Sequence, residues 1–227
     1  MKRKFTILFD LDGTLVDTAP DLMMAHNHVM KKFGYPTKST EDIRNLVGKG
    51  AGALIGRSIW GQAKKEFSKV LDEKIKNEMV KEFVSFYGKN IVNESTLVTG
   101  VKEFLIWCKE QNISMAVCTN KQEHLSNDLL KKIGIYDFFE YVAGSDTFDY
   151  CKPDPRHLTN VVEILDGDVK KTIMIGDSET DANAAKAAEI PVILLENGYT
   201  EKNTTEIYHN HLIKDFIGIE KIIKKYL

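Results

Sequence analysis

The sequence lacks most features that would mark a secreted, membrane-bound or nucleic-acid-binding protein. Its three cysteines in 227 residues show no paired spacing, which is typical of reduced thiols rather than of a disulfide framework. Lysine and arginine total 31 against 33 aspartate and glutamate residues, so no basic excess favours nucleic acid. No run approaches the ~18 apolar residues of a membrane span, and Asp10 interrupts the apolar run after the basic residues 1–4, which argues against a signal peptide. We therefore expect a cytoplasmic monomer or homodimer that binds neither nucleic acid nor membrane.

The sequence does contain an apolar run, Phe5 to Phe9, that ends abruptly in an acidic turn. A short run that is apolar on both faces predicts a buried strand of a parallel sheet. Asp10 and Asp12 follow, and residues two apart in an extended chain project to the same side. We expect both carboxylates to face the space beyond the carboxyl end of this strand, where open α/β sheets bind ligands.

The next 70 or so residues contain no segment that predicts a buried parallel strand. Helical spacing of apolar residues predicts a helix over 17–33 and further helices over 53–90. Glycines at 48, 50 and 52 surround Lys49, but no strand precedes them and no Ser or Thr follows the lysine, so a phosphate-binding Walker loop is excluded. We interpret residues 16–91 as a helical cap domain.

Strands and helices alternate after Thr99. Strands are predicted over 113–118, 141–143, 172–175 and 191–195, with an edge strand near 212–213, and a final amphipathic helix over 215–226. The predicted fold class is α/β, with a doubly wound parallel-sheet (Rossmann-like) core formed by residues 1–15 and 92–227 and the helical cap inserted after the first strand.

Polar residues follow several of these strands. Thr119 and Asn120 come after one strand, Asp177 and Asp181 after another, and Lys152 precedes a proline in the loop after the weak strand. Each has an ordinary explanation alone, such as a helix cap or a solvated charge. Because parallel strands end at one edge of a sheet, we expect all of them to form one site together with Asp10 and Asp12.

This collection of groups predicts phosphoryl transfer. Several carboxylates at one place favour a hard divalent cation, and Mg²⁺ uses few protein oxygens and commonly shares a phosphate oxygen. A lysine, a threonine hydroxyl and the start of a helix can bind the phosphate itself. An aspartate can then act as a nucleophile through an aspartyl-phosphate.

The ordered motifs resemble the four signatures of the haloacid dehalogenase superfamily. They are Asp10-x-Asp12-Gly-Thr, Thr119-Asn120, Lys152-Pro153 and Gly176-Asp177-Ser178-x-x-Asp181. The resemblance covers the whole chain and, within the superfamily, is to phosphoglycolate phosphatases, because of Arg44-x-x-Val47-Gly48-Lys49-Gly50, Lys121 after the second motif, and Gly198-Tyr199. One departure is Glu189, where the family usually has a glycine.

The resemblance implies a role for each motif residue. Asp10 would attack phosphorus, and Asp12 would act as general acid and then general base. Asp10, the backbone carbonyl of Asp12, and Asp177 would hold Mg²⁺, with Asp181 supporting them. Thr119, the Asn120 backbone and Lys152 would bind the phosphoryl oxygens, and Arg44 or Lys49 would meet the far end of a small phosphorylated metabolite. The implied substrate is 2-phosphoglycolate.

Other activities remain open. A pyrophosphatase, a sugar-phosphate phosphatase or a β-phosphoglucomutase-like enzyme would carry the same motifs. Dehalogenases and phosphonoacetaldehyde hydrolases usually lack an acid at the position of Asp12. A non-catalytic phosphate-binding protein would be expected to lack a motif residue, and none is missing.

Overall fold

The computed structural model describes residues 4–63 and 72–227 and contains a six-stranded parallel sheet. The strand order is β5-β4-β1-β6-β7-β8, with β1 near the centre. The strands are β1 (Thr6–Phe9), β4 (Ser114–Cys118), β5 (Tyr141–Ala143), β6 (Thr172–Gly176), β7 (Val192–Leu195) and β8 (His211–Ile213). The chain builds the sheet outwards from β1 through β4 to β5 and then returns to the other side of β1, so the order reverses between β1 and β6.

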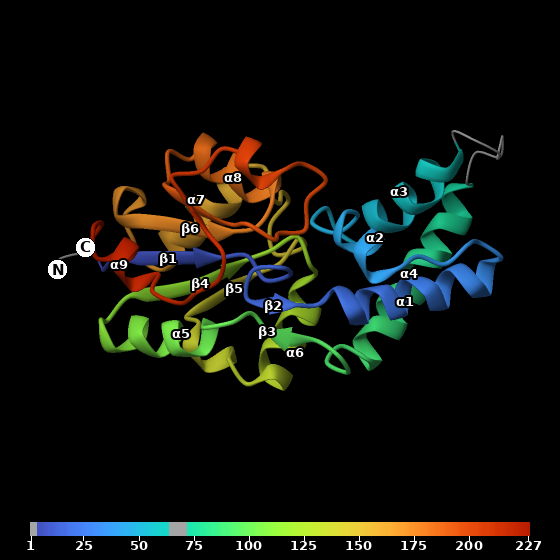
Figure 1. Ribbon diagram of the computed structural model, residues 1–227, viewed down its shortest axis with the longest axis horizontal. Coiled ribbons are helices and arrows are strands. Elements are labelled where there is room, and N and C mark those ends of the chain that lie inside the picture. Colours follow the sequence, from blue (N-terminus) through green and yellow to red (C-terminus); the bar gives the residue numbers. More distant parts are fainter. Residues whose placement is uncertain (1–3, 64–71) are drawn as a thin grey trace.

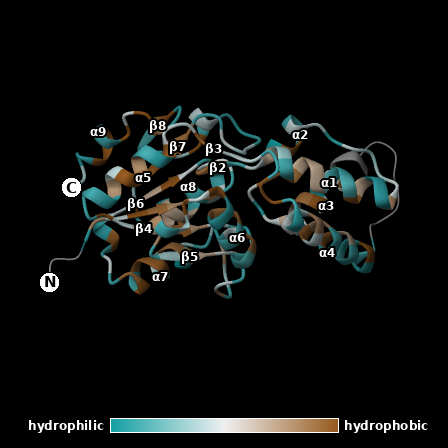
Figure 2. Cartoon of the chain, turned by 90° about the horizontal axis from the view of Figure 1, so that it is seen from below, coloured by the Kyte–Doolittle hydropathy of each residue, from teal (hydrophilic) through white to brown (hydrophobic). Residues whose placement is uncertain are grey.

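Helices cover both faces of this sheet, because alternate residues of each strand point to opposite sides. On one face, Ile7, Val117 and Ile175 pack with residues of α5 (Val101–Glu110) and α6 (Glu123–Ile133). On the other, Leu8 and Met174 pack with α7 (Arg156–Ile164) and α8 (Glu179–Ala187). Figure 2 shows the apolar strands between helices that turn polar faces outwards. This arrangement confirms the predicted α/β, doubly wound fold class.

A separate group of helices lies beyond one end of the sheet (Figure 1). It comprises α1 (Ala19–Phe33), α2 (Thr40–Arg44), α3 (Ala51–Ala63) and α4 (Glu73–Lys89), and we call it the helical part. Ser39 begins α2 with a capping box, in which its side chain accepts from the Asp42 amide and its own amide donates to Asp42. The helices predicted over 53–90 correspond to α3 and α4, and residues 64–71 lie outside the described residues. The division of the chain at residues 16 and 91 remains a prediction.

A two-stranded antiparallel sheet, which the sequence did not predict, lies where the chain enters and leaves the helical part. It pairs β2 (Val16–Asp17) with β3 (Thr96–Leu97), with Val16 opposite Leu97. The predicted helix over 17–33 therefore begins two residues later, at Ala19. The side chain of Asp21, on α1, accepts hydrogen bonds from the backbone amides of residues 93–95 and so fixes the returning chain beside the departing one.

The predicted helix over 215–226 is wrong for most of its length. Only α9 (Glu220–Ile223) is an α-helix there, and the other short helical turns of the described chain are η1 (Tyr136–Phe138), η2 (Val169–Lys171) and η3 (Thr204–Glu206). Gly218 has φ +78°, in the left-handed region, and the Asp215 side chain accepts from the Ile217 amide, so a turn replaces the first part of the helix. Glu189, the position where a glycine was expected, also has a positive φ of 57°.

None of the helices in the described ranges combines the length and apolar character needed to cross a membrane.

Candidate active site

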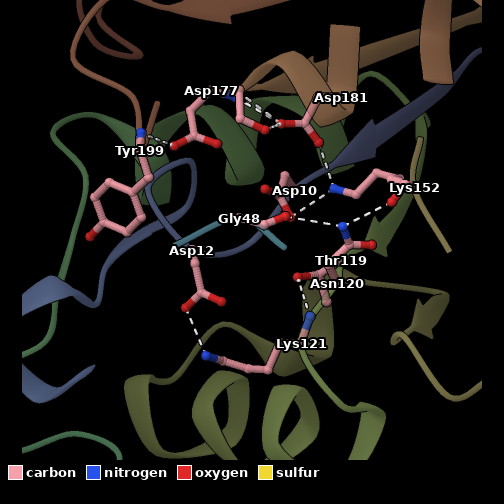
Figure 3. A network of polar contacts seen from close by, with 11 residues as sticks. Asp10, Asp12, Gly48, Thr119, Asn120, Lys121, Lys152, Asp177, Asp181 and Tyr199 are labelled. Carbon is pink, nitrogen blue, oxygen red and sulfur yellow. Dashed lines mark hydrogen bonds and ion pairs between the residues drawn. The ribbon is translucent and has the colours of Figure 1, made fainter. Parts of the chain in front are cut away.

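Two aspartates lie where the two central strands end. Asp10 follows β1, Asp177 follows β6, and these strands are neighbours in the sheet. Asp181, on the first turn of α8, completes a cluster in which one carboxylate oxygen of each residue lies within 4.8 Å of the others. All three side chains are buried, and Figure 3 shows them close to Lys152. The reversal of strand order between β1 and β6 places this cluster where doubly wound sheets bind their ligands.

Lys152 reaches the same cluster from the loop before α7. Its Nζ lies 2.9 Å from Asp10 Oδ1 and donates to Asp181 Oδ1 at 2.5 Å. The side chain is almost entirely buried, and the lysine lies at the sheet edge where its motif predicted it. Burial alone would lower the pKa of Lys152, but Asp10 and Asp181 outweigh it and raise the pKa above its usual value. Lys152 therefore stays cationic.

One lysine does not balance the charge of three carboxylates. Burial, and then the nearby charge of Asp181, raise the pKa of Asp10 to about 6, although Lys152 opposes the rise. Burial, and then repulsion from Asp10 and Asp181, raise the pKa of Asp177 well above its usual value. The site has an unbalanced negative charge and oxygen donors only, which is the chemistry that suits a hard divalent cation.

Backbone segments approach Asp177 too closely to admit side chains. A Cβ atom on Gly13 would lie 2.1 Å from Asp177 Oδ2, and one on Gly198 would lie 1.9 Å from the Asp177 carbonyl oxygen. The Tyr199 amide donates to Asp177 Oδ2 at 2.6 Å. These contacts fix the orientation of the Asp177 carboxylate.

Asp181 is held by protein donors on both oxygens. Oδ1 accepts from Lys152, and Oδ2 accepts from the amide and hydroxyl of Ser178 at 3.1 and 2.7 Å. A Cβ on Gly176 would lie 2.4 Å from the Asp181 Cβ, so the strand end and the helix start fit tightly together. Asp181 thus fixes both Lys152 and the turn that carries Asp177.

Asp12 faces the same opening, but its carboxylate has different partners. Oδ1 accepts from Thr18 Oγ1 at 2.6 Å and from Lys121 Nζ at 2.8 Å. Lys121 also donates to the Tyr87 hydroxyl at 3.1 Å, which brings a residue of α4 to the sheet edge. Sequence reasoning assigned no role to Lys121, although it directly follows the predicted Thr119 and Asn120.

Thr119 and Asn120 lie at the end of β4, as the predicted site requires. Thr119 is buried, and its Oγ1 accepts from the Lys121 amide at 3.2 Å. Asn120 Nδ2 donates to the carbonyl oxygens of Gly48 and Lys152 at 3.0 Å each. The Asn120 side chain therefore connects the glycine-rich loop of the helical part with the loop that carries Lys152.

A cavity of about 310 Å³ opens between the sheet edge and the helical part. Asp10, Asp12 and residues 119–122 line one side of it, and residues 47–54 with parts of α4 line the other. Lys49 belongs to the lining but Arg44 does not. The Arg44 guanidinium instead donates to Asp17 Oδ2 at 2.7 Å and lies over the ring of Tyr199. Of the two residues predicted to contact the far end of the substrate, only Lys49 therefore lines the cavity.

Tyr87 and Tyr199 are two further residues near the site to which the sequence analysis assigned no role. The Tyr199 hydroxyl donates to Asp17 Oδ1 at 2.5 Å, while its amide binds Asp177. The pair Gly198-Tyr199 after the last core strand, which contributed to the resemblance, was a signal in the sequence for this position. Tyr87 lies on a helix among other apolar residues and carries no such signal.

Comparison with known proteins agrees with this geometry. Residues 7–195 match the family model described as haloacid dehalogenase-like hydrolase. The chain is 37% identical over 210 residues to a phosphoglycolate phosphatase of Mesorhizobium japonicum, covering 92% of this chain and 90% of that one. It is 38% identical over 216 residues to a phosphoglycolate phosphatase of Caulobacter vibrioides, covering 95% and 89%.

Solved structures give the same answer for the fold. The crystal structure of a predicted phosphoglycolate phosphatase from Haemophilus somnus superposes with a TM-score of 0.90 at 31% identity, over 98% of this chain and 99% of that one. A β-phosphoglucomutase from Clostridium difficile, at 23% identity and a TM-score of 0.78, shares the fold over 98% and 97% of the two chains. The chain belongs to the haloacid dehalogenase-like hydrolase family.

Proposed function

We propose that this protein is a magnesium-dependent phosphomonoester hydrolase that cleaves 2-phosphoglycolate through an aspartyl-phosphate intermediate. One observation carries the proposal: three buried carboxylates and a single buried lysine meet at the ends of the central strands, beside a cavity. The names of the similar phosphatases support the substrate. The free cysteines agree with a cytoplasmic location.

The donor set fits Mg²⁺, because it is made of oxygen atoms and has an unbalanced negative charge. In this proposal Asp10, the backbone carbonyl of Asp12, and Asp177 hold the metal, and Asp181 supports them by fixing the Asp177 turn. When bound, the metal reduces the repulsion between the Asp10 carboxylate and the phosphate dianion.

The protein residues divide the reaction between them. Asp10 attacks phosphorus, the bond to the leaving oxygen breaks, and Asp12 gives that oxygen a proton. In the second half, Asp12 takes a proton from water as the water oxygen attacks phosphorus and the Asp10–phosphorus bond breaks. Thr119, the Asn120 backbone and Lys152 hold the phosphoryl oxygens during both displacements.

Specificity is assigned to the helical part, within the proposed cap of residues 16–91. Lys49 lines the cavity opposite the sheet edge and is proposed to meet the carboxylate of 2-phosphoglycolate. Arg44 is proposed to act less directly, because its guanidinium is bound to Asp17.

The test is phosphate release from a panel of 2-phosphoglycolate, pyrophosphate and hexose phosphates, with magnesium and with EDTA. We expect the highest kcat/KM for 2-phosphoglycolate and loss of activity in EDTA that magnesium restores. A preference for pyrophosphate or a sugar phosphate would refute the substrate, isomerisation of a sugar phosphate would indicate a mutase, and metal-independent activity would refute the magnesium site.

A further inference from the structure

We propose that Lys121 is a positioning residue for Asp12, and that Tyr87 makes this positioning depend on the helical part. The inference rests on the proposed function, in which Asp12 transfers a proton to the leaving oxygen. It concerns a lysine that is separate from Lys152 and lies outside the carboxylate cluster of Asp10, Asp177 and Asp181.

In the described part of the chain, the hydrogen bonds to the Asp12 carboxylate reach only one of its two oxygens. Both of its donors, Thr18 Oγ1 at 2.6 Å and Lys121 Nζ at 2.8 Å, bind Oδ1. No hydrogen bond among the described residues reaches Oδ2, and Asp12 lines the cavity. Two donors on one oxygen fix the rotation of the carboxylate, so Oδ2 is left for the substrate.

Lys121 is not an ordinary surface lysine. Its side chain is 6% exposed and that of Asp12 is 12% exposed, so the pair is largely shielded from water. Ion pairs between exposed side chains contribute little, but shielded ones fix geometry and are costly to break. The Lys121 Nζ also lies 4.5 Å from the centre of the Tyr87 ring, which adds a cation–π contact.

Tyr87 connects this pair to the helical part. It is fully buried on α4, its ring stacks on that of Phe83 at 6.0 Å, and its hydroxyl accepts from Lys121 at 3.1 Å. Lys121 therefore contacts Asp12, which follows β1, and also Tyr87 in the helical part. A displacement of α4 would remove one of the two oxygen partners of Lys121 and loosen its hold on Asp12.

The positioning matters most when the leaving group is a poor one. As the phosphorus–oxygen bond breaks, its electron pair goes to the leaving oxygen, which takes the proton from Asp12 Oδ2. Asp12 becomes a carboxylate whose charge faces Lys121. A 4-nitrophenolate leaves without much help from an acid, whereas an alkoxide requires the proton.

The test uses Lys121→Met and two phosphate esters whose alcohol portions carry no carboxylate, 2-hydroxyethyl phosphate and 4-nitrophenyl phosphate. We compare kcat/KM, because it reports the first half-reaction. The expected result is a fall for the hydroxyethyl ester that exceeds the fall for the nitrophenyl ester by about tenfold, the effect of losing one hydrogen bond to a charged group. Lys121→Arg keeps the cation and should restore most of the difference. Lys131→Met, on the exposed side of α6, is the matched control.

Three outcomes would overturn the inference. Equal falls for the two esters would mean a general structural effect. A loss confined to 2-phosphoglycolate, with the hydroxyethyl ester unaffected, would make Lys121 a residue that binds the substrate carboxylate. Unchanged kcat/KM for 2-phosphoglycolate, 2-hydroxyethyl phosphate and 4-nitrophenyl phosphate would show that Asp12 does not need Lys121 to position it. If Lys121→Met does not fold, the Lys121→Arg and Tyr87→Phe variants are compared in the same way.

Tyr87→Phe tests the link to the helical part, because it removes the hydroxyl and keeps the ring. It should give a smaller loss with the same preference for the hydroxyethyl ester, and no further loss when Lys121 is already methionine. Independent effects of the two substitutions would overturn the coupling.

A further pair of variants separates failure of this inference from failure of the proposed function. If Asp10→Asn still turns over, the proposed function itself fails. If Asp10→Asn is inactive and Asp12→Asn is selective between the esters while Lys121→Met is not, only this inference fails.

Discussion

The two walls of the cavity have opposite characters. The sheet edge presents the charged side chains of Asp10, Asp12 and Lys121, and Lys121 Nζ lies 2.8 Å from Asp12 Oδ1. The helical part presents apolar side chains of α3 and α4, among them Leu54, Val80 and Phe83, with Lys49 as a cation in the same lining. The contrast suggests that reactivity depends on the sheet edge and selectivity on the helical part, and variants of Asp10 and Lys49 test one wall against the other.

The largest effect is expected at the sheet edge, from Asp10→Asn. An amide cannot act as the nucleophile, so turnover should fall by at least about 10⁴-fold for every phosphate ester, whatever its leaving group. The measurement is phosphate release, with circular dichroism to show that the fold persists. Asp128→Asn, exposed on α6, is the control and should behave like the unchanged protein. Residual turnover near the normal rate would remove the sheet edge from its assigned role.

A second test concerns the acid sensitivity of the six-stranded sheet and the helices that cover it, which together form the sheet part. Burial, and then the nearby Lys152, lower the pKa of His157, on α7, to about 4. The unfolded chain takes up this proton below about pH 6.5 and the folded chain does not, so the unfolded state binds more protons as the pH falls. Stability should therefore decrease between about pH 6.5 and 4 by up to about 3 kcal/mol from this residue.

Urea unfolding across that pH range measures this effect. His157→Leu should lose this part of the pH dependence, while His124→Gln, exposed on α6, should keep it. Identical pH profiles for the His157 variant and the unchanged protein would contradict the expectation.

A smaller effect is expected on the opposite wall, from Lys49→Met. The loss of a cation near the substrate carboxylate should raise the KM for 2-phosphoglycolate by about tenfold, or about 1.4 kcal/mol, with a smaller change in kcat. Steady-state kinetics is measured with 2-phosphoglycolate and with 4-nitrophenyl phosphate, which has no carboxylate. A change in KM for 2-phosphoglycolate alone would indicate an effect on carboxylate binding and not on the sheet edge. Arg44→Met is the comparison, and an effect larger than that of Lys49→Met would reverse their assigned roles.

The smallest effect is expected at an ion pair that joins the two parts directly. Arg57, on α3, pairs with Glu201, and the glutamate side chain is 61% exposed. A double-mutant cycle with Arg57→Met and Glu201→Gln should give a coupling of about 1 kcal/mol or less that decreases with added salt. Chemical unfolding at two salt concentrations measures it. A larger coupling that salt does not affect would mean that the pair is shielded from solvent and contributes to holding the two parts together.

The sheet edge was predictable because its signals are local. Short apolar runs at the expected lengths gave the strands, and parallel strands place their carboxyl ends together, so Asp10 and Asp177 could be assigned to one site from order alone. Buried partners were not predictable in this way. Sequence order placed Lys152 at this edge but did not indicate that its side chain is buried between Asp10 and Asp181.

The helical part was predictable only as helices. Which residue of α4 reaches the site depends on how α4 packs, and Tyr87 meets a lysine 34 positions further along the chain. Helical spacing indicates which face is buried and gives no information about the partner of that face. The C-terminal helix was misassigned for a different reason, since a single glycine with positive φ was enough to replace its first turns.

The β2–β3 pairing has a practical consequence for protein engineering. The chain leaves the sheet part at Val16 and returns at Leu97, and these two residues lie opposite each other. The whole intervening segment could therefore be exchanged for that of a relative with only two adjacent joints, leaving the parallel strands untouched. With specificity in the helical part, as proposed above, chimaeras made in this way are expected to exchange substrate preference as a single module.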